Sequence, residues 1–374
     1  MRIFFHIFIL FIPLTAFSQQ IKVSVFNSIP VKGFVIALYD GEYEIECNEA
    51  ILEFKKGNIF YITLYDQRLL LNSAGGIIGT FDEVNLKPKT DSSKIQITLI
   101  DPKNGSRIYN GSMHIKVEYG RILLINETDV EKYIAGVVEA ETGTREIPEF
   151  QKAQALLCRT YLYSHINRHE SEGFNLCDEV HCQVYKGSSP YTGYIYKSTI
   201  QTNNKVIVSK YNSLITASFH GNCGGETESS LNTWLKDEEF LVPVKDPYCF
   251  DSNNANWEKQ IPLLSWKKYL TGHGINTRNV PISTLEMKRT GRQNYYRIGK
   301  DSILTKQIRG DWNLKSSFFQ VLIKHDMIHI KGHGYGHGVG MCQDGAMNMA
   351  LKGFNYEEII NFYFKGVHLE DVNR

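Results

Sequence analysis

Four segments of the sequence carry residues whose types and spacing are suited to chemistry. The first places two carboxylates, Glu139 and Glu141, between an apolar stretch and Gly143. A carboxyl group that lies against apolar neighbours has a raised pKa, so it can hold a proton for general-acid catalysis. Glutamates beside a turn are more often simply solvated, and the pattern alone leaves both interpretations open.

The second segment gathers Cys177, His181 and Cys182 within six residues, with His165 and His169 one helical turn apart just upstream. Sulfur and nitrogen ligands at this spacing suit a tetrahedral zinc ion. A local disulfide between Cys177 and Cys182 explains the same thiols if the protein is secreted. Spacing does not choose between the two.

The third segment ends a strand-like run in His220 and continues into Gly224 and Gly225. Glycines allow a backbone to approach a ligand closely, although a plain tight turn has the same composition. Cys223 can pair with Cys249, and closing that loop is expected to stabilise the fold by roughly 3 kcal/mol.

The fourth segment, residues 332–343, has five glycines in its first nine residues and contains His337 and Gly338. It lacks the lysine of a phosphate-binding P-loop, and its glycine spacing has no βαβ context. A glycine run that enters a helix still makes an anion or oxyanion cradle. The histidines within it suit hydrogen bonding or metal binding, and a purely structural role is the alternative.

The elements that must position these segments give a mixed α+β pattern. Residues 21–130 alternate apolar and polar side chains as half-buried strands do, and Asn104-Gly105 and Asn110-Gly111 are typical hairpin tips. A short helix is predicted over 129–138, followed by a long, mostly buried helix over 148–168 that begins at Pro148. Further along we expect strands at 206–208, 214–219, 285–288 and 295–298, and helices at 264–270, 343–352 and 356–364.

The first eighteen residues predict export. A basic start, an apolar stretch and small residues at Ala16 and Ser18 follow the order of a secretory signal peptide. The apolar run is shorter than the roughly 20 residues that a membrane-spanning helix needs, although an uncleaved anchor is the alternative. We therefore expect a soluble mature protein in the periplasm or outside the cell, where disulfides persist.

The overall charge excludes one class of function. Lysine and arginine number 41 and aspartate and glutamate 40, so the net charge is +1. The chain as a whole therefore lacks the positive field that nucleic-acid binding requires. The seven cysteines are an odd number, so they cannot all pair within one chain.

Taken together and in this order, the four segments resemble the SpoIID/LytB family, the group of sporulation stage II D proteins and amidase enhancers. The resemblance extends over about residues 125–368, and more loosely over the strands before them. The matching pieces are residues 133–141, Lys152 to Ala155, Arg159 to Tyr161, His181 to Tyr185, His220 with Gly224, Gly225 and Thr227, Trp234, residues 336–341, Gln343, Gly345 and Ala346.

The resemblance implies a bacterial cell-wall protein that acts as a lytic transglycosylase on glycan strands stripped of their peptides. The catalytic acid of the family maps to Glu141 rather than Glu139. The resemblance also places zinc at Cys177, His181 and Cys182, with His169 or His165 as the fourth ligand, although other members lack these cysteines. It implies a strand-rich fold with one long buried helix and two C-terminal helices around a substrate groove.

The same resemblance divides the chain and its groove. A β-rich part is expected at 19–125 and the family core at 126–374, with an inserted α/β segment at about 251–330. The residues expected to contact glycan are His220, Gly224, Gly225, His337, Gly338 and Gln343. Of the remaining cysteines, Cys223 and Cys249 are assigned to a disulfide, while Cys47, Cys158 and Cys342 are left as packing residues or free thiols.

Three functions follow from these residues. The first is a transglycosylase in which Glu141 protonates the leaving oxygen and the 6-hydroxyl of the sugar closes a 1,6-anhydro ring. The second is a non-catalytic wall-binding protein that stimulates an amidase partner. The third is a zinc hydrolase of wall peptides, which needs a metal with an open position, whereas the close spacing of the zinc residues is more typical of a structural site.

Overall fold

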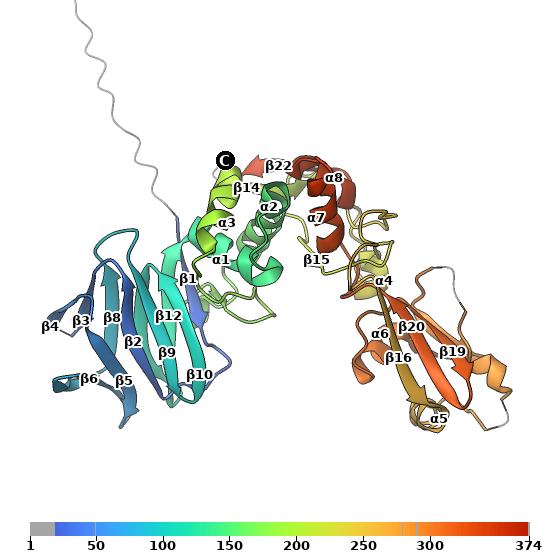
Figure 1. Ribbon diagram of the computed structural model, residues 1–374, viewed down its shortest axis with the longest axis horizontal. Helices are drawn as coiled ribbons and strands as arrows, with labels where there is room; N and C mark the ends of the chain where they lie inside the picture. Colours follow the sequence, from blue (N-terminus) through green and yellow to red (C-terminus); the bar gives the residue numbers. More distant parts are fainter. Residues whose placement is uncertain (1–18, 49, 279, 289–290, 373–374) are drawn as a thin grey trace, which may run out of the picture. The chain divides into compact units, whose positions relative to one another are not determined.

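The computed structural model describes residues 19–372 except 49, 279 and 289–290, so the signal peptide predicted at 1–18 lies outside the described residues. The chain divides into two compact units, Met1–Tyr133 and Ile134–Arg374 (Figure 1). Sheets and helices both build the described part, which confirms the predicted α+β class. None of the helices within it is long and apolar enough to cross a membrane.

The first unit consists of antiparallel strands in two sheets. Within this unit one sheet has the order β1-β12-β11-β8-β3-β4, and the other has the order β10-β9-β2-β5-β6-β7. Side chains alternate between buried and partly exposed along β9, as the sequence pattern predicts. The strands are β1 Gln20–Val25, β2 Gly33–Asp40, β3 Tyr43–Cys47, β4 Ala50–Phe54, β5 Ile59–Tyr65, β6 Arg68–Ser73, β7 Gly76–Phe81, β8 Glu83–Pro88, β9 Lys94–Asp101, β10 Lys103–Asn110, β11 Ser112–Glu118 and β12 Arg121–Asp129.

The two Asn-Gly dipeptides predicted to form hairpin tips do not lie at the tips of hairpins. Asn104-Gly105 lies inside β10, where the register with β9 shifts between Lys103 and Ser106. Asn110-Gly111 connects β10 of one sheet to β11 of the other. Gly111 has a φ of 77°, and a Cβ there would lie 2.2 Å from the carbonyl oxygen of Glu127. The glycine therefore allows the backbone to pass close to Glu127 where the chain crosses from one sheet to the other. The Asn-Gly dipeptide alone does not distinguish this crossing from a hairpin.

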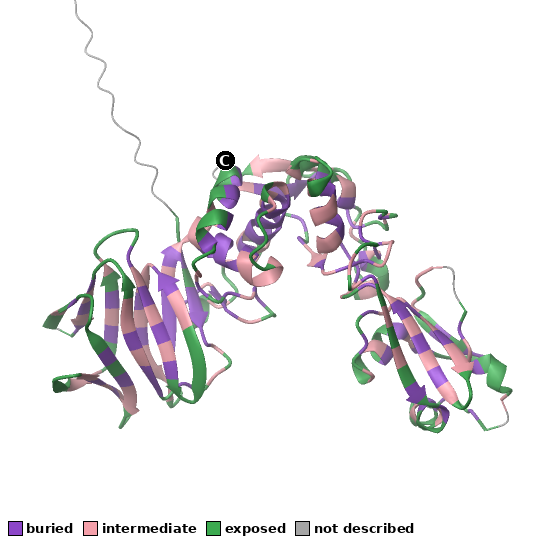
Figure 2. Ribbon diagram, viewed as in Figure 1, coloured by how far each residue is buried: buried purple, intermediate pink, exposed green. Residues whose placement is uncertain are grey.

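The second unit is built around the long helix α2, Pro148–Ser164, with proline in its first turn. Most of its side chains are buried (Figure 2), and α3, α7, α8 and β14 all contact it. The helix ends before the predicted residue 168, because the chain turns at His165. The helices are α1 Val130–Thr142, α3 Thr192–Thr199, α4 Ser230–Trp234, α7 Gln343–Leu351 and α8 Tyr356–Tyr363, and the short strands are β13 Leu176–Cys177, β14 Lys205–Ser209, β15 Phe219–His220, β21 Met341–Cys342 and β22 Val367–Asp371.

Two residues of the family-like motif in α2 hold this core together. The guanidinium of the fully buried Arg159 donates hydrogen bonds to the carbonyl oxygens of Lys205, at 3.1 Å, and Thr199, at 3.4 Å. The hydroxyl of Thr160 accepts a hydrogen bond of 2.9 Å from the backbone of Ile207. Both residues therefore connect α2 by hydrogen bonds to the backbone of α3 and β14.

Residues 256–333 form a sheet of order β16-β20-β19 with its own apolar cluster around the fully buried Trp266. The predicted strand at 285–288 is wrong, because that stretch ends a 3-10 turn and then makes a single bridge from Met287 to Val321. The predicted strand at 214–219 is also wrong for most of its length, because only Phe219 lies in a strand, β15, and Leu214 makes a single bridge to Val208. The elements here are β16 Asn256–Pro262, α5 Leu263–Gly272, η3 Ile282–Leu285, β17 Tyr295–Ile298, β18 Asp301–Leu304, α6 Thr305–Asp311, β19 Phe319–Lys324 and β20 Met327–His333.

Candidate functional site

The two glutamates of the first segment lie on the last turn of α1. The helix extends to Thr142, past Val138 where the predicted helix ends, and Gly143 follows with a φ of 76°. Val137 and Val138 are fully buried, one turn before Glu141. The sequence places the helix end too early because the apolar periodicity stops at Val138, whereas the glycine stop signal comes five residues later.

Gly136 brings the segment after Cys182 against α1. A Cβ at this position would lie 2.5 Å from the carbonyl oxygen of Gly187 and 2.7 Å from the ring of Tyr185. Only a residue without a side chain permits this approach. The contact places the backbone of Val184 and the side chain of Lys186 beside Glu141.

The surroundings of Glu141 favour its protonated form. Burial raises the pKa of its carboxyl group, while a hydrogen bond from the backbone of Val184 and the charge of Lys186 partly oppose that rise. The carboxyl group also lies at the C-terminal end of a helix, where the helix dipole disfavours a negative charge. Such a group is suited to donate a proton.

Glu139 is held differently, although it lies only two residues away. Its two carboxylate oxygens accept hydrogen bonds from the hydroxyl groups of Ser189 and Thr192. Its acceptors are therefore engaged within the protein. The two glutamates therefore differ in their surroundings: hydroxyl groups engage Glu139, whereas the carboxyl group of Glu141 is buried beside the backbone of Val184.

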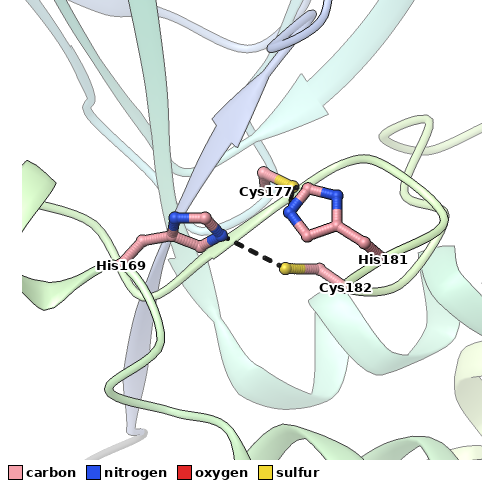
Figure 3. A group of neighbouring side chains, drawn as sticks. All are labelled: His169, Cys177, His181 and Cys182. Carbon is pink, nitrogen blue, oxygen red and sulfur yellow. Dashed lines mark hydrogen bonds between the residues drawn. The ribbon is translucent and has the colours of Figure 1, made fainter.

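The structure brings together His169, Cys177, His181 and Cys182 (Figure 3). One ligand atom from each lies within 4.8 Å of all the others. The Nε2 atom of His169 is 3.4 Å from the Sγ of Cys182, and the Nε2 atom of His181 is 3.4 Å from the Sγ of Cys177. His165 is not part of this group, because its ring stacks on Tyr161 and bonds to Ser164.

Contacts around this group orient its members. Glu172 lies 2.5 Å from the Nδ1 atom of His169, which leaves Nε2 directed at Cys182. A carboxylate behind a histidine is the usual arrangement at a metal ligand. The carbonyl oxygen of His181 accepts hydrogen bonds from Tyr161, at 2.9 Å, and from Arg168. Two thiols and two imidazoles fit a tetrahedral zinc ion with no open position.

The third and fourth segments meet through β15 and β21, which pair in parallel. The rings of His220 and His337 lie 5.5 Å apart, and Trp234 lies 5.3 Å from His337. The Nδ1 atom of His220 is 3.1 Å from the carbonyl oxygen of Val339, and its buried Nε2 atom has no partner in the described part of the protein. The pair therefore offers one unused imidazole nitrogen.

Burial also sets the charge of these two histidines. Burial lowers the pKa of His337 to about 4, and the charge of Arg309 adds to that effect. Burial lowers the pKa of His220 well below its ordinary value. Both rings are therefore neutral at physiological pH, and the ring of His337 is held by the backbone of Val339 and Phe219, which leaves only the Nε2 atom of His220 without a partner among the described residues.

The glycines of the third segment serve approaches within the protein. A Cβ on Gly224 would lie 2.6 Å from the Cβ of His333, and one on Gly225 would lie 2.6 Å from the ring of Phe250. Both glycines have positive φ angles of 71° and 98°. The structure thus fills with its own side chains the space that the sequence analysis reserves for a ligand.

Gly338 and Gln343, the remaining residues expected to contact glycan, have identified neighbours. A Cβ on Gly338 would lie 2.7 Å from the guanidinium group of Arg292. The side-chain amide of Gln343 donates a 3.4 Å hydrogen bond to Gln154 of α2. Gln154 in turn donates a hydrogen bond to the Sγ of Cys158. Gln343 therefore belongs to a hydrogen-bonded chain that joins α7 to α2.

A family model described as SpoIID, stage II sporulation protein, matches residues 118–210, the stretch that contains Glu141 and the zinc-type group. Over this stretch the chain is similar to proteins of the SpoIID/LytB family.

The similarity to curated relatives extends over about two thirds of the chain. It is 26% identical over 271 residues to stage II sporulation protein D of Bacillus subtilis, covering 67% of this chain and 76% of that protein. It is 29% identical over 276 residues to an uncharacterized protein of Brachyspira hyodysenteriae, covering 72% and 74%. It is 28% identical over 290 residues to the amidase enhancer of B. subtilis, covering 63% of this chain and 40% of that protein.

A second group of metal-ligating side chains lies beyond the residues that the SpoIID model matches. Cys223, Asp246, Cys249 and Cys342 are all buried, with one ligand atom of each within 4.8 Å of the others. The Sγ atoms of Cys223 and Cys249 are 3.4 Å apart and both thiols are free, so the structure does not contain the expected disulfide. The sequence does not reveal this group, because Cys342 lies 119 residues after Cys223 and no motif marks Asp246.

Proposed function

We propose that this chain is an exported lytic transglycosylase of peptidoglycan. Its substrate is a glycan strand stripped of peptides, and it cleaves the β-1,4 bond between N-acetylmuramic acid and N-acetylglucosamine. The observation that carries the proposal is the environment of Glu141, in which burial and the helix end favour the protonated carboxyl group. Glu139, saturated by two hydroxyl groups, has no comparable environment.

The proposed reaction needs only one carboxyl group. Glu141 donates its proton to the glycosidic oxygen as the bond from C1 to that oxygen breaks, and positive charge develops on the sugar ring. The 6-hydroxyl of the same muramic acid then attacks C1, and the Glu141 carboxylate accepts the hydroxyl proton. The products are a 1,6-anhydro-muramic end and a free 4-hydroxyl, with the catalytic acid regenerated.

The neutral histidine pair suits this substrate. A stripped glycan carries hydroxyl and amide groups and one lactyl carboxylate per disaccharide, so recognition depends mainly on hydrogen bonds. The unpartnered Nε2 atom of His220 and the amide of Gln343 are proposed to supply some of them, and the ring of His337 beside His220 is proposed to contact the sugar by its face. The net charge of +1 is consistent with a substrate that is attracted only weakly by charge.

We propose a structural zinc ion at His169, Cys177, His181 and Cys182. Bound zinc would cross-link the two ends of this segment and would supply no reacting group, because four protein donors leave it no open position. The same segment continues into Val184, which donates a hydrogen bond to Glu141. This argument also disfavours the zinc-hydrolase hypothesis.

A second candidate function is supported by the relative whose printed name is amidase enhancer. In that case the chain would bind glycan without cutting it and would stimulate a cell-wall amidase. Glycan binding and amidase stimulation would then be independent of the proton on Glu141. The two functions therefore differ in their response to a single substitution.

The deciding experiment is mass spectrometry of peptide-free glycan strands after incubation with the wild type and with Glu141→Gln. We expect anhydro-muramic fragments from the wild type and none from the variant, while Glu139→Gln, the matched control, retains cleavage. Hydrolysed, non-anhydro products would overturn the mechanism. Amidase stimulation by both forms, with no glycan cleavage by either, would establish the second function instead.

A further inference from the structure

We propose that Cys223, Asp246, Cys249 and Cys342 form a second zinc site. Its ligand atoms lie within 4.8 Å of one another. In a tetrahedral site with zinc–sulfur bonds of about 2.3 Å, neighbouring ligands lie roughly 3.8 Å apart. The observed separations of 3.4 Å between the sulfurs of Cys223 and Cys249, and of 3.2 Å from Cys223 to Asp246, need only small outward movements to fit.

Three separate stretches of chain supply these ligands. Cys223 follows β15 directly, Asp246 and Cys249 lie on the loop before β16, and Cys342 caps the N-terminus of α7. Thiolate sulfur is a preferred ligand of zinc, and a carboxylate oxygen can complete the tetrahedron. Four protein donors make a closed site, so its role is structural.

Backbone groups already point at the sulfur atoms. The N–H of Gly225 lies 3.1 Å from the Sγ of Cys249, and the N–H groups of Cys223 and Gly345 lie 3.2 and 3.4 Å from the Sγ of Cys342. Hydrogen bonds of this kind favour the charged form of their acceptor. Buried thiolate ligands need such hydrogen-bond donors, because water cannot stabilise their negative charge.

Asp246 is the residue that a disulfide leaves unexplained. Its side chain is 1% exposed and forms no ion pair within the described part of the chain. The hydroxyl of Tyr363 donates a 2.9 Å hydrogen bond to its Oδ2 atom, as a second-layer group does at a metal ligand. A buried carboxylate without a cation is costly. A zinc ion among the three thiols supplies that cation, whereas a bond between two of them does not.

The remaining negative charge also has a partner. Three thiolates and one carboxylate exceed the charge of one zinc ion, and the buried guanidinium of Arg292 donates a 2.6 Å hydrogen bond to the carbonyl oxygen of Cys223. The guanidinium group also donates a 2.8 Å hydrogen bond to the carbonyl oxygen of Glu226, which holds it beside the cysteines. Its positive charge therefore offsets part of the excess negative charge of a zinc–thiolate centre.

Metal content of the full mature chain tests the proposal without reference to activity. The protein is purified with a phosphine reductant and without chelators, and its metals are counted by inductively coupled plasma mass spectrometry. We expect two zinc ions per chain in the wild type and in Cys158→Ala, which removes a buried thiol outside both groups. We expect one zinc ion in Cys249→Ser/Cys342→Ser.

A cobalt experiment identifies which group holds which ion. In Cys177→Ser/Cys182→Ser only the second site remains, with three thiolates, whereas the first site has two. The sulfur-to-cobalt charge-transfer absorption of Cys177→Ser/Cys182→Ser should therefore be stronger per bound cobalt than that of Cys249→Ser/Cys342→Ser. Where a variant does not fold, the zinc count and cobalt spectrum of the wild type decide. A single wild-type zinc ion that is kept in Cys249→Ser/Cys342→Ser and lost in Cys177→Ser/Cys182→Ser, or peptide mapping that finds a Cys223–Cys249 disulfide, would overturn the second site.

Discussion

A substitution at the closely packed Gly136 tests whether the segment that contacts α1 positions Glu141. The change is Gly136→Ala, which adds one methyl group that would lie 2.5 Å from the carbonyl oxygen of Gly187 and 2.7 Å from the ring of Tyr185. Restoring ordinary contact distances requires the segment to retreat from α1 by about 1 Å. Val184, which bonds to Glu141, lies on that segment.

The magnitude follows from two opposing terms. Forcing a methyl group into a packed interior costs about 1–3 kcal/mol, while replacing glycine by alanine within a helix gains up to about 1 kcal/mol. We therefore expect a net loss of roughly 1 kcal/mol in the free energy of unfolding. A displacement of about 1 Å at a catalytic group can lower the rate on the order of 100-fold, so glycan cleavage should fall far more than stability.

Tryptophan fluorescence during urea unfolding measures the stability term, because all four tryptophans lie in the second unit. Release of anhydro-muramic ends measures the catalytic term. Gly310→Ala is the matched control, since it lies in α6 with open space around the added methyl group. It should leave cleavage unchanged. A Gly136→Ala protein with wild-type cleavage and wild-type stability would refute the proposed role of this contact.

Further predictions concern the acid and its neighbours. Glu141→Gln should lower cleavage by at least 100-fold by the loss of a general acid, against a much smaller loss for Glu139→Gln, as measured by initial rates on stripped glycan. Because burial raises the pKa of Glu141, kcat/KM should fall as pH rises through that pKa, and a pH profile whose alkaline limb survives in Glu141→Gln would contradict this assignment. The ring of His337, with its pKa lowered to about 4, should show no titration above pH 6 by NMR. His169→Ala should lose the zinc of the first group and His165→Ala should keep it, and zinc retained at the wild-type level in His169→Ala would remove His169 from the ligand set.

The sequence predicts the regular parts of this fold well for a physical reason. Alternation of apolar and polar residues is a local property, so the strands β1, β5, β9 and β11 and the long helix α2 can be recognised from their own residues. The failures occur where long-range contacts decide the backbone. Asn110-Gly111 has the composition of a hairpin tip, but a glycine is required there because the carbonyl oxygen of Glu127 on β12 leaves no room for a Cβ atom.

The candidate site shows the same division. The group from His169 to Cys182 lies within one stretch of sequence, so spacing alone suggests a metal site, although only the structure chooses His169 over His165. The second group assembles Cys223 with Cys342, which are 119 residues apart, and with a carboxylate that no motif marks. A sequence pattern can reveal residues that are close along the chain, whereas the residues of the second group become close only when the chain folds.

The two cysteine groups occupy places where the fold has little regular structure to supply rigidity. β15 and β21 have two residues each, and the stretch from Cys177 to Thr192 is mostly loop. Short strands contribute few ladder hydrogen bonds, so they cannot by themselves fix a catalytic geometry. Yet these stretches carry His220 and the backbone that faces Glu141. Cross-links through metal ions would restrict the motion of such segments, which gives a physical reason for placing one group of thiols near Glu141 and the other near His220.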